Sequence, residues 1–224
     1  MSAAVLLVVL LCGSAEAATR HGRLKPSNRT LLLDGEPWLS RGVAYSPTPI
    51  GIEPSGSQSL DFFTDEYAAI FRRDLPRMAA AGINSLRIYV MDADCEGVPT
   101  CSAHKLFFEE CEAHNISVIG GFELSASHHN LRNPVLFGRV KQELREQLDS
   151  LKVGGAMPHP VVMWTVGNEL NLPANGFVCD GNGTSACMYN GSEVLALYRR
   201  IDELCEIVVR APSHAPSPTA RAHV

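Results

Sequence analysis

The sequence has no excess of basic residues, few charged residues in all, and no long apolar run after its N-terminus. Its 19 lysines and arginines stand against 24 aspartates and glutamates, a formal net charge of -5, so it lacks the positive charge typical of nucleic-acid-binding proteins. It contains no Cys-x-x-Cys pair, no Cys/His cluster with zinc spacing and no Gly-x-Gly-x-x-Gly turn. We therefore expect no nucleic-acid partner, no transmembrane span, no metal and no cofactor.

The composition is that of a folded globular domain. Apolar residues make up 46% of 224 residues, enough for one domain with a sizeable core. Residues 1–17 resemble a signal peptide, because an apolar run precedes the small-x-small site Ala15-Glu16-Ala17, although Lys and Arg are missing from its first residues. We expect a secreted protein, extracellular or in a cell wall.

In a secreted protein, Asn-x-Ser/Thr sequons can be glycosylated and cysteines can form disulfides. Four Asn-x-Ser/Thr sequons are candidate glycosylation sites: Asn28, Asn115, Asn182 and Asn190. Six cysteines follow the leader and are candidates for disulfides: Cys95, Cys101, Cys111, Cys179, Cys187 and Cys205. Their spacing favours two local pairs, Cys95 with Cys101 and Cys179 with Cys187, although six cysteines allow fifteen pairings.

After a short hairpin with an Asp34-Gly35 turn, β-branched runs alternate with amphipathic segments, which is typical of βα units around a parallel sheet. The predicted strands are 42–46, 85–90, 117–122 and 161–166, and the predicted helices are 65–81, 102–114, 134–152 and 192–210. Gly82 is predicted to end the first helix.

Four βα units are half of a (β/α)8 TIM barrel. We therefore predict an α/β fold in which residues 18–210 form the N-terminal half of such a barrel and 211–224 form a Pro/Ala/Ser-rich tail. A doubly wound sheet is the alternative fold, but it lacks its glycine-rich turn here.

Three segments resemble retaining glycosidases of glycoside hydrolase clan A. They are Arg41 to Pro47, Arg73 to Tyr89, and the stretch from His159-Pro160 to Gly167-Asn168-Glu169. The second segment is most similar to the β-1,3-glucanosyltransferases of family 72, and the fourth strand is more similar to families 2 and 5. The resemblance implies a TIM barrel and a carbohydrate substrate.

The end of the fourth predicted strand carries the main candidate site, because barrel enzymes place their active sites at the C-terminal strand ends. Glu169 is suited to act as a general acid, and Asn168 can hydrogen-bond a sugar hydroxyl. By resemblance, Glu169 is the clan's acid/base and Arg87 the residue that orients the nucleophile. Tyr45 and Tyr89 end the first two strands and would either bind sugar or pack in the core.

The second carboxylate of the mechanism has no clear candidate, and we leave the nucleophile unknown. The clan's nucleophile ends a seventh strand, which this sequence does not contain. Glu123 ends the third predicted strand and could face Glu169, whereas Asp202, Glu203 and Glu206 fit a solvated helix face. His128 and His129 fit a polar loop better than a metal site.

The sequence therefore predicts a glycoside hydrolase or transglycosylase acting on β-linked polysaccharide such as β-1,3-glucan. The alternative is a catalytically inactive carbohydrate-binding or assembly protein, because the half that carries the nucleophile is missing. We expect the chain to be a fragment of a longer enzyme, a half barrel that self-associates, or a remnant that only binds.

Overall fold

The computed structural model describes residues 24–51, 61–89, 91, 104–124, 131–168 and 191–211. Several predictions fall outside these residues: the signal peptide, Glu169, His128, His129, the sequons at Asn182 and Asn190, and the cysteines at 95, 101, 179 and 187. No helix among the described residues is long and apolar enough to cross a membrane.

A four-stranded parallel sheet forms the centre of the molecule. Its strands are β4 (Gly42–Ala44), β5 (Ser85–Arg87), β6 (Ser117–Phe122) and β7 (Val161–Val166). They pair in the order of the chain, β4-β5-β6-β7, with every pair parallel. A doubly wound sheet would reverse its order after the first strands, so the barrel prediction is confirmed and the alternative is wrong.

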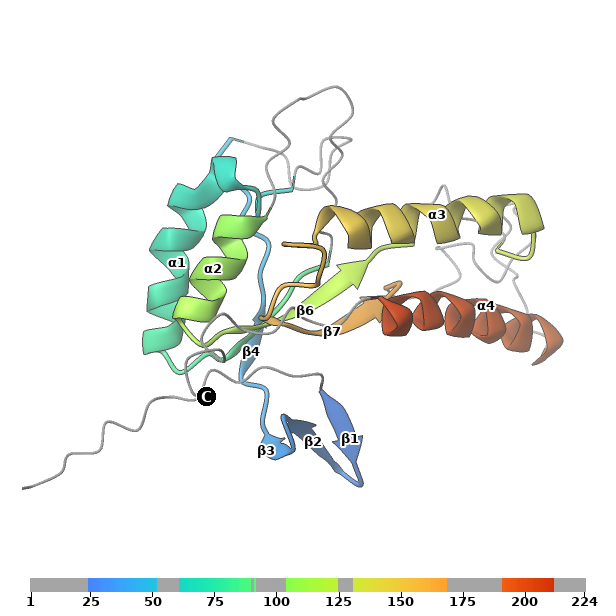
Figure 1. Ribbon diagram of the computed structural model, residues 1–224, viewed down its shortest axis with the longest axis horizontal. Helices are drawn as coiled ribbons and strands as arrows, with labels where there is room; N and C mark the ends of the chain where they lie inside the picture. Colours follow the sequence, from blue (N-terminus) through green and yellow to red (C-terminus); the bar gives the residue numbers. More distant parts are fainter. Residues whose placement is uncertain are drawn as a thin grey trace, which may run out of the picture.

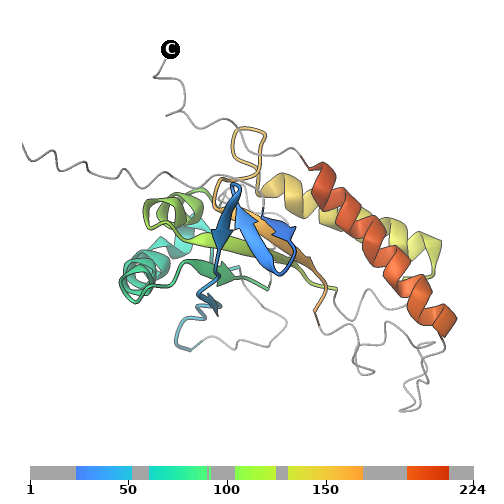
Figure 2. The ribbon, with the colours of Figure 1, turned by 90° about the horizontal axis from the view of Figure 1, so that it is seen from below.

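A helix follows each strand. They are α1 (Ala68–Ala80, after the short 3-10 helix η1, Asp65–Tyr67), α2 (Lys105–Ala113), α3 (Pro134–Ser150) and α4 (Gly191–Arg210). In Figures 1 and 2, α1 lies beside α2 and α3 beside α4, with the strands between the two pairs. The end of α1 is set by Gly82, whose φ of +81° needs no Cβ.

One apolar core lies between the sheet and the helices. Alternate strand residues such as Leu86, Val118 and Trp164 point into it, and Phe71, Phe107 and Phe137 meet them from three helices. Arg87 and Met163, which alternate with these core residues, lie on the opposite face and are less buried. The sheet therefore has a helix-covered face and a more open face.

An antiparallel hairpin sheet precedes the barrel strands. It consists of β1 (Lys25–Ser27), β2 (Thr30–Leu33) and β3 (Glu36–Trp38), and β1 was not predicted from the sequence. Its second turn has Asp34 at φ 56° and Gly35 at φ 85°, as a two-residue hairpin turn requires. Leu33 and Trp38 pack on Val162 near the start of β7, away from the strand ends that carry the candidate site (Figure 1).

The described cysteines and sequons can be placed on this fold. Cys111 on α2 and Cys205 on α4 carry free thiols, so two of the six disulfide candidates are corrected. The physical reason is distance along the sheet, since α2 and α4 belong to different helix pairs in both views (Figures 1 and 2). Asn28 and Asn115 are exposed in turns with positive φ, and glycosylation there remains a prediction.

Candidate functional site

The candidate site lies at the C-terminal ends of β5 and β7. Arg87 is the last residue of β5, and Asn168 comes two residues after β7. Arg87 Nη2 donates a hydrogen bond of 3.0 Å to Asn168 Oδ1, which joins positions 81 residues apart in the sequence. The two candidates that the sequence placed on separate strands are therefore in direct contact.

Tyr89 completes this group. The guanidinium carbon of Arg87 lies 4.3 Å from the centre of the Tyr89 ring, a cation–π contact, and Tyr89 is 39% exposed. Arg87 and Tyr89 are two residues apart on an extended segment, so they share one face while Leu86 and Ile88 enter the core. The stack leaves Arg87 in a defined orientation with its end toward Asn168.

The Nε of Arg87 is an unpaired donor among the described residues. It is buried and has no hydrogen-bond partner there. Buried donors are nearly always paired in proteins, because an unpaired one costs free energy. A guanidinium with an unpaired Nε is suited to an oxygen acceptor such as a carboxylate.

Gly121 and Gln147 hold the strand ends in place, and sequence reasoning did not single out either residue. A Cβ on Gly121 would lie 2.3 Å from the carbonyl oxygen of Tyr89, so only glycine allows β6 to approach the segment that carries Tyr89. Buried Gln147 on α3 donates from Nε2 to the carbonyl oxygens of Met91 (2.8 Å) and Gly121 (3.1 Å). The sequence offered one signal for Gln147, because it is a polar residue on the apolar face of a predicted helix.

Tyr45 does not belong to this group. It is 6% exposed, packs against Phe63 with ring centroids 5.9 Å apart, and donates from its hydroxyl to Asp74 Oδ2 at 3.0 Å. Of the two roles considered for Tyr45, the core role is the one observed. Its proposed sugar contact is therefore corrected, because the ring has no open face and the hydroxyl is already used.

The pKa values around Tyr45 predict how stability depends on pH. Burial, and then the hydrogen bond to Asp74, raise the pKa of the Tyr45 hydroxyl. A hydrogen bond from Arg73 lowers the pKa of Asp74. Stability from Tyr45 is complete below its unfolded pKa of about 10 and is lost as pH rises beyond it; stability from Asp74 is lost as pH falls below about 4.

We expect Tyr45→Phe to lower the free energy of unfolding at pH 7 by about 1 kcal/mol, because one hydrogen bond is lost. Above pH 10 the wild-type protein should lose stability more steeply than the variant. Urea unfolding at pH 7, 9.5 and 10.5 measures both effects. Tyr198→Phe, at a 63% exposed position on α4, is the control and should match the wild type at each pH. Equal pH slopes for wild type and Tyr45→Phe would contradict the assignment.

Three other carboxylates that the sequence analysis considered, Glu203, Glu206 and Glu123, can be placed on the structure. Glu203 pairs with Arg200 at 2.8 Å and with Lys141 of α3 at 3.5 Å, and Glu206 pairs with Arg210 at 3.0 Å, so both belong to ion pairs on the helix surface. Glu123, directly after β6, is exposed at the same end of the sheet as Arg87 and Asn168. Within the described ranges, no group of three His, Cys, Asp or Glu side chains could hold a metal.

A second buried pair lies where two connecting segments meet the helices. His104 Nε2 and Asp61 Oδ2 are 2.5 Å apart, with side chains 1% and 4% exposed. Asp61 precedes η1 and His104 precedes α2, so the pair fixes the points at which the β4–α1 and β5–α2 connections end. Sequence reasoning missed both residues, since neither stands in a recognisable motif.

The protein matches known proteins in its structure but not in its sequence as a whole. No family model and no curated protein matches the sequence. The fold is similar to that of yeast Gas2p. The Saccharomyces cerevisiae Gas2p complex with laminaritriose and laminaritetraose matches 87% of this chain with a TM-score of 0.52 and 18% identity. The Gas2p complex with laminaripentaose matches the same share with a TM-score of 0.54.

These matches confirm the sequence-based resemblance at the level of the fold. Gas2p is a family 72 β-1,3-glucanosyltransferase of clan A. This is the clan and family that segments of the present sequence resemble. This chain spans 38% of the Gas2p chain in both complexes. The parallel sheet of this chain, with its helices, is consistent with part of such a TIM barrel.

Proposed function

We propose that this chain carries the acid/base half of a retaining glycoside hydrolase or transglycosylase acting on β-linked polysaccharide such as β-1,3-glucan. The observation that carries the proposal is the Arg87–Asn168 hydrogen bond at the strand ends, one residue before Glu169. In TIM-barrel enzymes this end of the sheet is where substrates bind. Secretion into a cell wall, as the N-terminus predicts, would bring the protein to such polysaccharides.

The proposed chemistry proceeds in two steps. A second carboxylate attacks the anomeric carbon while Glu169 gives its proton to the leaving sugar oxygen, so a glycosyl–enzyme bond forms as the glycosidic bond breaks. Glu169 then takes a proton from water or from an acceptor hydroxyl, whose oxygen attacks the anomeric carbon and releases the carboxylate. Water as acceptor gives hydrolysis, and a sugar hydroxyl gives transfer.

The contacts of Asn168 and Arg87 support these roles. The Oδ1 of Asn168 accepts from Arg87, which leaves its Nδ2 as a donor for a sugar hydroxyl. The unpaired Nε of Arg87 is suited to hold a second carboxylate ionised and oriented. The exposed ring of Tyr89 offers an apolar surface to a sugar ring.

The substrate class rests on the structural neighbours. Gas2p was crystallised with laminaritriose, laminaritetraose and laminaripentaose, which are β-1,3-linked glucose oligomers. A chain with the same partial fold and a basic, aromatic strand-end cluster is suited to ligands of the same class. The alternative is a protein that binds carbohydrate of this class without turnover.

The test is incubation of the purified chain with reducing-end-labelled laminaripentaose. Shorter or longer products, with the anomeric configuration retained by NMR, support the enzyme. Binding by calorimetry without products supports the binding protein, and neither binding nor products would contradict both. β-1,4-linked cellopentaose is the linkage control and should give a weaker signal in either assay.

A further inference from the structure

A buried amide lies behind the candidate site. Gln147, near the end of α3, is 6% exposed. The other buried residues of this helix are all apolar: Phe137, Val140, Leu144 and Leu148. A buried amide costs free energy unless its polar atoms find partners. An amide at this position is therefore better explained by what its Nε2 binds than by how its side chain packs.

The amide binds where β5 separates from β6. One residue after the end of β5, Ile88 N donates to Ile119 O at 2.9 Å. Two residues further along β6, the carbonyl oxygen of Gly121 accepts from Nε2 of Gln147 at 3.1 Å, and the same Nε2 donates to Met91 O at 2.8 Å. Alternate residues of a parallel strand face the same neighbour. The amide therefore ties the segment after β5 to β6 at the next position of the ladder.

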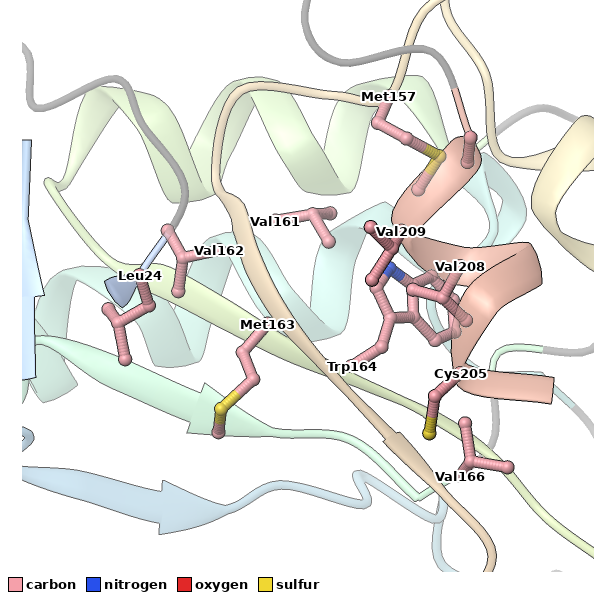
Figure 3. A pocket seen from close by; sticks show the side chains of 11 residues that line it. Leu24, Met157, Val161, Val162, Met163, Trp164, Val166, Cys205, Val208 and Val209 are labelled. Atoms are coloured by element: carbon pink, nitrogen blue, oxygen red, sulfur yellow. The ribbon is translucent and has the colours of Figure 1, made fainter. Parts of the chain in front are cut away.

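Two glycines bring the backbone of β6 against the strands on either side. A Cβ on Gly121 would lie 2.3 Å from the carbonyl oxygen of Tyr89, and a Cβ on Gly120 would lie 3.2 Å from ring atoms of Trp164. Figure 3 shows Trp164 turned from β7 toward α4. Because no side chain separates these contacts from the β6 backbone, a shift of β6 would be felt on both sides.

Each half of the candidate site is joined to one of these contacts. On the β5 side, the ring of Tyr89 lies 4.3 Å from the guanidinium carbon of Arg87. On the β7 side, Gly167 N donates to Phe122 O at 2.7 Å, directly before Asn168. The hydrogen bond from Arg87 to Asn168 joins residues at the ends of β5 and β7 and so spans the end of β6. The buried amide thus holds the strand on which the distance between the two halves depends.

We infer that Gln147 is a positioning residue for the candidate site: its two carbonyl contacts fix the distance between Arg87 and Asn168. It touches no sugar itself. An apolar side chain of the same length would remove both donors from these carbonyl oxygens and free the segment after β5 to move away from β6. The guanidinium and the Tyr89 ring would then no longer face a ligand together. The choice of a β-1,3-glucan as this ligand rests on the proposed function.

Gln147→Met tests the inference, because methionine has nearly the same length and cannot donate a hydrogen bond. Leu144→Val, one turn earlier on the same buried face, is the control, since it removes one core methylene and no hydrogen bond. By calorimetry under conditions in which all proteins are folded, Gln147→Met should bind laminaripentaose about tenfold or more weakly, the loss of one charge-assisted hydrogen bond to the ligand. Leu144→Val should bind it as the wild type does.

A second readout does not depend on the sugar. The buried Nε–H of Arg87 should give a protected signal in a ¹H–¹⁵N spectrum, assigned by its loss in Arg87→Lys. Gln147→Met should shift or broaden this signal, and Leu144→Val should leave it unchanged. An unchanged signal in Gln147→Met overturns the inference, and so does a shifted signal with unchanged affinity. A wild type that does not bind laminaripentaose overturns the proposed function, and the Arg87 signal alone then decides the inference.

Gln147→Glu adds a pH test, which also serves if the methionine variant does not fold. A carboxylate repels the two carbonyl oxygens, so burial and this repulsion should raise the pKa of the new carboxyl above its ordinary value of about 4.3. Its protonated form can donate to one of them. From pH 8 to pH 5, the affinity of the variant relative to the wild type should rise, and its Arg87 signal should return toward the wild-type position. A constant difference from the wild type in both readouts overturns the inference.

Discussion

Replacing Glu169 with glutamine should lower turnover of laminaripentaose by about 10²- to 10⁴-fold, the range for loss of a general acid/base. Glutamine has nearly the same shape as glutamic acid but cannot donate a proton to the leaving sugar oxygen. Urea unfolding of the variant should match the wild type. Full activity in Glu169→Gln would remove Glu169 from the mechanism.

The leaving group separates a catalytic role from a structural one. An aryl β-glucoside with an acidic phenol departs without protonation, so Glu169→Gln should lose far less in its first step on that substrate than on laminaripentaose. A damaged fold would lower both activities by the same factor. Glu36→Gln, at an exposed position on β3 far from the strand ends, is the matched control and should behave as wild type with both substrates.

The sequence predicted the regular elements well where the apolar pattern was long. The strands at 117–122 and 161–166 were predicted with the bounds that β6 and β7 have, and α3 and α4 differ by two residues or fewer at each end. The first two strands are shorter than predicted, β4 by two residues and β5 by three. Their ends depend on where the neighbouring strand stops pairing, which hydrophobic alternation does not encode.

The candidate site was predicted in part, for reasons that particular residues illustrate. Arg87 and Asn168 were each placed at the end of a predicted strand, and because parallel strands end at the same edge of the sheet they are in contact. Tyr45 was left open between site and core, although Val43 two residues earlier is apolar and shares its face. The Asp61–His104 pair could not be predicted, since its members meet only after two connecting segments have folded.

Breaking that buried pair should give the largest loss of stability. We expect Asp61→Ala to lower the free energy of unfolding by about 3 to 5 kcal/mol, because removal of one partner leaves a buried polar group without its counterpart. The loss should be severe because Nδ1 of His104 already has no partner among the described residues, and Asp61 Oδ1 also accepts from Phe63 N at 2.9 Å. Urea unfolding measures the effect.

An exposed ion pair between α1 and α2 serves as the comparison for the stability of the buried Asp61–His104 pair. Arg72 on α1 and Glu110 on α2 are 2.8 Å apart with side chains 51% and 24% exposed, so Glu110→Ala should cost less than about 1 kcal/mol. The double variant Asp61→Ala, His104→Ala should be less destabilised than the sum of its single variants, because each removes the group that the other leaves unpaired. Additive losses, or equal costs for Asp61→Ala and Glu110→Ala, would show that the buried pair does not hold the two connections at the barrel mouth.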